Sequence, residues 1–181
     1  MTTRTTLGSA SVPVSRERPS SAARVAAAVW AMVGVSTLFA EPTLRLGVRA
    51  SRTIAAGLRP GEWVGLVVVA AALLYTEGHR ALQKRLAPKV VARTLALGRQ
   101  PSLGAVLLAP LYALSLVRAE RRELGRSWLG VVLIAAAVMI VRALPAPWRG
   151  IVDGGVALAL LWGLVSLWVQ FVSALKEEFA G

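Results

Sequence analysis

The sequence predicts an all-α fold: a polytopic transmembrane helical bundle of about five spans with an amphipathic basic loop helix. The longest uncharged run extends from Gly154 to Leu175, and about 20 apolar residues suffice to cross a hydrocarbon core roughly 30 Å thick. Hydrophobic residues make up 56% of the 181 residues and charged residues only 17%, against roughly a quarter in soluble domains. Lys and Arg lie in blocks between the apolar runs, a distribution typical of membrane proteins.

The basic residues favour a membrane rather than nucleic acid as the partner. A formal charge of +12 would suggest nucleic-acid binding in a soluble chain, but here the cations are concentrated between apolar runs. Nearly all of them are Arg, and with the many Ala, Val, Leu and Gly residues this composition is typical of a GC-rich bacterial genome. We therefore expect a multi-pass protein of a bacterial inner membrane, with no nucleic-acid partner.

The Cys and His content limits the chemistry of the chain. It has no Cys, which excludes disulfides, thiolate metal ligands and Cys nucleophiles. A single His argues against a His-based metal site. We therefore expect no metal, no cofactor and no catalytic residue.

The domain organisation follows from where the apolar runs begin and end. Residues 1–21 are rich in Thr, Ser, Arg and Pro without a periodic apolar face, and we expect a disordered tail. Residues 22–176 form the predicted transmembrane domain, and residues 177–181 a short C-terminal tail. A cleaved secretory signal ending at Ala40 is the alternative for the first apolar run, but Leu38 is larger than the small residue preferred two positions earlier.

The first two spans have recognisable ends. The first is predicted over Ala22–Leu44, with Glu41-Pro42 near its far end, where a Pro disturbs a helix. In the following segment three arginines would share one face of an interfacial helix: Arg45, Arg49 and Arg52. The second span begins at Pro60, which together with Glu62 suits a first helical turn, and runs to about Tyr75.

The remaining spans determine the predicted topology. The third lies within Gln100–Val117 around Pro110, the fourth covers Ser127–Val141, and the fifth begins at Asp153 as an N-cap and ends at Leu175. Five spans place the termini on opposite sides, and the positive-inside rule favours a cytoplasmic N-terminus. A four-span alternative makes the Pro110 segment re-entrant or the first segment interfacial.

The segment 80–99 has an apolar stripe flanked by cations. Leu82, Leu86 and Val90 recur every four residues, a pattern typical of a helix lying in the membrane interface. Cations near an anionic leaflet are attracted to lipid headgroups, and the candidates are Arg80, Lys84, Arg85, Lys89 and Arg93. The alternative is an ordinary positive-inside loop without a specific partner.

Two further groups of residues are candidate functional sites. Glu77 and His79 are close in sequence, and a carboxylate beside an imidazole can relay protons because His titrates near neutral pH. Residues two apart on a helix point to different sides, however, so a pairing would require a break at Gly78. Arg149 and Asp153 could pair across the turn into the fifth span, either as a ligand site or as a structural cap.

These features lead to three functional hypotheses. The first is a non-enzymatic accessory or scaffold subunit that packs against lipid, another membrane protein or a second copy. The second is a small oligomeric transporter, which a polar residue paired across a packed helix interface would favour. The third is a membrane enzyme, which a water-filled cleft joining Glu77, His79 and Arg149 would favour.

Overall fold

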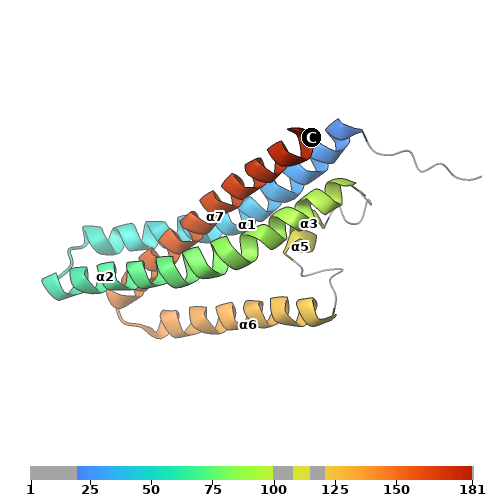
Figure 1. Cartoon of the computed structure of the whole chain (residues 1–181). Helices are drawn as coiled ribbons and strands as arrows, with labels where there is room; N and C mark the ends of the chain where they lie inside the picture. The colour runs from blue at the N-terminus through green and yellow to red at the C-terminus, as the bar shows by residue number, and fades with distance from the viewer. Residues whose placement is uncertain (1–19, 100–107, 115–120, 181) are drawn as a thin grey trace, which may run out of the picture.

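The computed structural model describes residues 20–99, 108–114 and 121–180, and these residues form helices joined by short turns (Figure 1). Residues 60–99 form one long helix, which is made of three helical elements that follow each other without a break. The elements are α1 (Ser21–Ala55), α2 (Pro60–Leu73), η1 (Leu74–Leu86), α3 (Ala87–Arg99), α5 (Ala109–Ala113), α6 (Arg121–Ala143) and α7 (Trp148–Ala180). The all-helical class predicted from the sequence is therefore confirmed for the described residues.

Three helices are long and apolar enough to cross a membrane. They cover Ser21–Ala55, Pro60–Leu97 and Trp148–Glu178, and a shorter apolar helix covers Trp128–Ala143. The second of them has 38 residues, so it is at most about 57 Å long at 1.5 Å per residue. That exceeds the roughly 30 Å of a hydrocarbon core, so a large part of this helix would extend beyond the core of a membrane.

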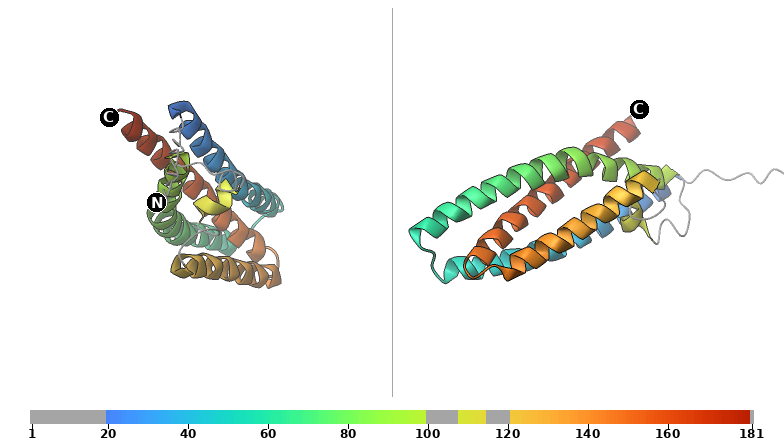
Figure 2. Two further views of the ribbon diagram at one scale, coloured as in Figure 1. Left: turned by 90° about the vertical axis from the view of Figure 1, so that its right-hand side faces the viewer. Right: turned by 90° about the horizontal axis from the view of Figure 1, so that it is seen from below.

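The long helices run in alternating directions. α1 runs opposite to the helix 60–99 and to α7, and α6 runs opposite to α7 along the outside of the bundle (Figures 1 and 2). Arg24, near the start of α1, forms an ion pair with Glu178, near the end of α7. We call this the terminal end, and we call the end with the turns 56–59 and 144–147 the turn end. Both ends of the described chain thus lie together, as in the four-span alternative, whereas five spans would separate them.

The buried core lies toward the terminal end. Ala113 of α5 belongs to this core. Its largest members come from α1, α3 and α7: Met32, Val35, Val90, Val91, Leu167 and Phe171. Ser20 caps α1, its side chain accepting a hydrogen bond from the Ala23 N–H. Toward the middle of the bundle the helices approach closely, and a Cβ added at Gly163 would lie 2.5 Å from Leu82 Cδ1. A glycine is therefore needed there for η1 to pack against α7.

The first helix is longer than the predicted first span. α1 continues through Pro42 to Ala55, so the basic segment after Leu44 is its last part and not a separate interfacial helix. Several hydroxyl groups donate to carbonyl oxygens four residues earlier at 2.7–2.9 Å: Ser36, Thr37, Thr43 and Thr76. Such bonds satisfy a hydroxyl without water, which suits helices in an apolar environment.

The second helix does not end near Tyr75 as predicted. It widens into the π-helix η1, and the Ala87 N–H donates to the carbonyl of Leu82, five residues earlier. Segment 80–99 is helical as expected, but its apolar stripe faces the bundle: Val90 is fully buried and Leu82 contacts Gly163. The side of this helix that was expected to face the membrane interface is therefore packed against α1 and α7.

The predicted third and fourth spans have different outcomes. Of Gln100–Val117 only residues 108–114 are described, and they contain the five-residue helix α5, whose Pro110 packs against Gly34 of α1; the rest lies outside the described residues. The fourth span falls within α6. The outer surface of α6 is apolar along most of its length, with these side chains exposed: Trp128, Leu129, Val132, Leu133, Ile134, Met139 and Ile140.

Candidate functional site

The apolar parts of the long helices are staggered. The apolar parts of α1 and of the helix 60–99 are both N-terminal, and because these helices are antiparallel the two parts lie at opposite ends of the bundle. Gly78 lies against Ala159, and Leu82 against Gly163. The charged stretch that follows Tyr75 is therefore level with the middle of the apolar run of α7.

This stagger exposes a row of cations at the depth of an apolar helix. Four side chains on the outside of η1 and α3 are exposed: Arg80, Lys84, Arg85 and Lys89. We call them the cationic face. Charged residues at membrane depth usually mark a polar pathway or a protein contact, because hydrocarbon does not solvate them. Arg93, the fifth predicted cation, is half-buried beside this face.

Glu77 and His79 do not form the pair that a proton relay would need. Glu77 is exposed, whereas His79 is half-buried and its Nδ1 lies 2.8 Å from Gln83 Oε1. The helix continues through Gly78, so no break at this residue brings Glu77 and His79 together. The ring of His79 also stacks on Tyr75, with centroids 6.0 Å apart.

Gln83 connects η1 to α7, and the sequence alone did not identify it. Its Oε1 accepts a hydrogen bond from Trp162 Nε1 at 2.9 Å, and its backbone carbonyl accepts one from Gln170 Nε2 at 3.0 Å. An indole nitrogen can only donate, so the atom facing it is an oxygen. His79 Nδ1 must then carry the hydrogen that it donates to the same oxygen, and the Nε2 atom of the ring remains for a second hydrogen bond.

Asp153 is buried and pairs with an arginine of another helix. Its side chain is 5% exposed, and its Oδ2 accepts a hydrogen bond from Arg49 Nη1 at 3.0 Å. Arg49 lies near the end of α1, so the pair joins two helices across a packed interface, where Gly154 contacts Ala50. A polar residue paired across a packed helix interface is the feature that would favour the transport hypothesis.

The predicted role of Asp153 as an N-cap is wrong. α7 begins at Trp148, so Asp153 lies in its second turn, where the backbone N–H groups are bonded within the helix. The predicted partner, Arg149, is half-buried, and its Nε has no hydrogen-bond partner among the described residues. The sequence showed Arg49 as part of an arginine stripe, but it gave no sign of which helix this stripe faces.

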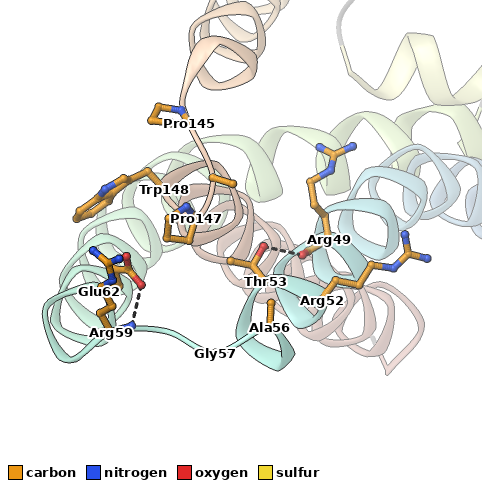
Figure 3. Close-up of a pocket in the computed structure, with 11 residues that line it drawn as sticks. Arg49, Arg52, Thr53, Ala56, Gly57, Arg59, Glu62, Pro145, Pro147 and Trp148 are labelled. Atoms are coloured by element: carbon orange, nitrogen blue, oxygen red, sulfur yellow. Dashed lines mark hydrogen bonds between the residues drawn. The ribbon is translucent and has the colours of Figure 1, made fainter.

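A hollow of about 740 Å³ opens beside this ion pair at the turn end. Figure 3 shows Arg49 and Arg52 on one side, at the end of α1, and Arg59 with Glu62 on the other, at the start of α2. Thr53, Ala56 and Gly57 form its floor, and Pro145, Ala146, Pro147 and Trp148 complete the lining. We call this hollow the turn-end pocket.

The turn-end pocket has an excess of positive charge. Three arginines and one glutamate are among its lining residues, and the carboxylate of that Glu62 already accepts a hydrogen bond from the Arg59 backbone N–H at 2.7 Å. Within the described ranges, no three His, Asp or Glu side chains are grouped to hold a metal ion. The pocket chemistry therefore favours an anion.

Comparison of the chain with protein-family models, with curated proteins and with solved structures finds no match. The features of this chain that bear on its function are the cationic face, the Arg49–Asp153 pair and the turn-end pocket.

Proposed function

We propose that the chain is an integral protein of a bacterial inner membrane that acts as a non-enzymatic accessory or scaffold subunit. The observation that supports this proposal is the cationic face, which lies at the depth of the apolar run of α7. A partner subunit, or a second copy, would cover this face and supply polar groups or ordered water to it.

The energetic cost of leaving this face against lipid supports the proposal. Insertion scales assign roughly 2.5–3.5 kcal/mol to a charged side chain at a helix centre and less toward its ends, so the four together would cost on the order of several kcal/mol. That is a large part of the total stability of a typical domain, about 5–15 kcal/mol. A chain alone in lipid would need to shift or distort its helices to hydrate these cations.

The arrangement of the helices favours four passes within this proposal: α1, the helix 60–99, α6 and α7. Both termini then lie on one side. In a four-pass topology residues 1–24, 90–126 and 176–181 would be on that side and hold 11 Lys and Arg, against six in residues 45–62 and 142–149 at the turn end. The positive-inside rule then favours cytoplasmic termini. The five-span count remains the alternative prediction.

Labelling of single cysteines tests this orientation, since the chain has none of its own. Cys placed at Ser102 should resist an impermeant thiol reagent in intact cells and react after lysis, because the connection after α3 should be cytoplasmic. Cys placed at Gly57, in the turn between α1 and α2, should react from outside. The reverse pattern would refute the orientation.

Photo-crosslinking tests the accessory role. A photoreactive amino acid at Lys84 should form protein adducts in native membranes. The same group at Val165, which is exposed on α7 at the same level, serves as the control and should form far fewer. An adduct of twice 19.1 kDa would identify a second copy as the cover. Absence of protein adducts at Lys84 would reject the proposal.

A small oligomeric transporter is the second candidate, and the Arg49–Asp153 pair favours it. An ion pair between two packed helices can couple their movement to the charge of a passing solute. An oligomer that turned its cationic faces inward would line a path suited to anions. Proteoliposomes should then take up small anions faster than protein-free vesicles, and Arg49→Ala should abolish the difference. Equal uptake with and without the protein would reject transport.

A further inference from the structure

We propose that the turn-end pocket binds the phosphate group of an anionic phospholipid headgroup. The pocket lies outside the segment 80–99, for which the sequence predicted contact with anionic lipid headgroups. The proposal requires the chain to lie in a membrane, but it does not depend on an accessory or a transport role.

The charges of the pocket suit a phosphate. The side chain of Arg52 has no hydrogen bond or ion pair within the described part of the chain, and Arg49 shares its charge with Asp153 through one of its two terminal nitrogens. Guanidinium groups bind phosphate oxygens through paired N–H donors. The pocket therefore offers several charged donors that the fold itself does not use.

The positions of the arginines leave room for the headgroup. In Figure 3 the guanidinium groups of Arg49 and Arg52 extend away from Arg59, with the floor of Thr53, Ala56 and Gly57 between the two sides. Arg52 and Arg59 are exposed, so both can turn toward a phosphate on this floor. A hollow of about 740 Å³ admits a phosphate with its glycerol and not only a bare ion.

The surroundings favour a lipid over a free phosphate. The pocket lies where the apolar run of α2 begins, and two half-exposed tryptophans mark this level, Trp63 and Trp148. Tryptophan prefers the headgroup region of a membrane. Beyond Trp63 the outer side of α2 exposes Val64, Val67 and Val68, a surface along which an acyl chain can lie while its headgroup occupies the pocket.

Native mass spectrometry of the purified full-length chain tests the proposal. The wild type is titrated with phosphatidylglycerol and, separately, with phosphatidylcholine, whose phosphate carries a compensating choline cation. Glycerol phosphate and inorganic phosphate serve as soluble competitors. The test variant is the double substitution Arg52→Gln and Arg59→Gln. The control is Lys176→Gln, which removes a positive charge from an exposed residue at the terminal end.

A second variant separates charge from shape. Ala56→Phe adds a bulky ring to the pocket floor and leaves every charge in place. Both Arg52 and Arg59 are exposed and far from the core, so the double variant should keep the helical content and melting temperature of the wild type. Circular dichroism of each variant checks this expectation before lipid binding is measured.

The expected result is selective binding of phosphatidylglycerol that the pocket variants weaken. The double substitution should weaken it about tenfold, the equivalent of about 1.4 kcal/mol, and Ala56→Phe should weaken it as well. Lys176→Gln should bind like the wild type. Equal binding of both lipids, or equal weakening by the Lys176 control, would overturn the proposal. Competition by glycerol phosphate at concentrations similar to those of the lipid would overturn the assignment to a lipid.

Discussion

The Arg49–Asp153 ion pair should contribute measurably to stability, whereas Arg149 and Asp153 should not be coupled. Asp153 has a 5% exposed side chain, and the side chain of Arg49 is 41% exposed. Breaking a fully buried ion pair costs about 3–5 kcal/mol, and because Arg49 is partly exposed we expect about 2 kcal/mol for Asp153→Ala. Arg49→Ala should cost more, about 3 kcal/mol, because it leaves the buried carboxylate without its partner.

Two double-mutant cycles test this prediction in the same assay. Reversible unfolding in mixed detergent micelles, followed by circular dichroism, gives the free energy of unfolding of each variant. The cycle with Arg49→Ala and Asp153→Ala should give a coupling energy of about 2 kcal/mol, and Asp153→Asn should lose only part of it. The matched cycle with Arg149→Ala should give a coupling near zero. Equal coupling of both arginines, or stronger coupling to Arg149, would refute the packing of α1 against α7.

Three further predictions concern the packing and the solvent of the bundle. Gly163→Leu should destabilise the protein by about 1–3 kcal/mol because a Cβ there meets Leu82, whereas Gly130→Leu should be nearly silent because nothing lies within 4 Å of that glycine. Gln83→Leu should cost about 0.5–1.5 kcal/mol by removing the oxygen that the partly exposed Trp162 Nε1 donates to, and Glu77→Gln, an exposed control, should leave the unfolding free energy unchanged. Alkaline carbonate should leave the chain in the membrane pellet, and recovery in the soluble fraction would contradict an integral membrane protein.

The class of the fold could be predicted from the sequence because it depends on local composition. Runs of apolar residues between basic blocks predicted helices of membrane length, and α1, α2 and α7 begin within a few residues of the predicted starts. The ends of the helices were harder to predict. Neither Pro42 nor Gly78 interrupts its helix, since packing against α7 stabilises both helices beyond these residues.

The contacts between helices could not be predicted, because they depend on register. The sequence predicted Arg149 as the partner of Asp153, but the pairing of Asp153 with Arg49 follows from the antiparallel packing of α1 and α7. The π-helical stretch has no clear sequence signal either. It places Gln83 between His79 and Trp162, a role that an isolated Gln in a basic segment does not indicate.

The most direct test is to measure whether lipid, water or protein surrounds the helices at the depth of Lys84 and Val165. Nitroxide spin labels on single cysteines, Lys84→Cys and Val165→Cys, can be studied in native membranes with oxygen and a polar nickel chelate as relaxation agents. If a partner covers the cationic face, Val165 should show high oxygen and low nickel accessibility, as for a residue facing lipid. Lys84 should show low oxygen accessibility, with the label immobilised or reached by nickel. The proposed accessory role would be contradicted if both labels faced lipid, or if nickel reached both freely.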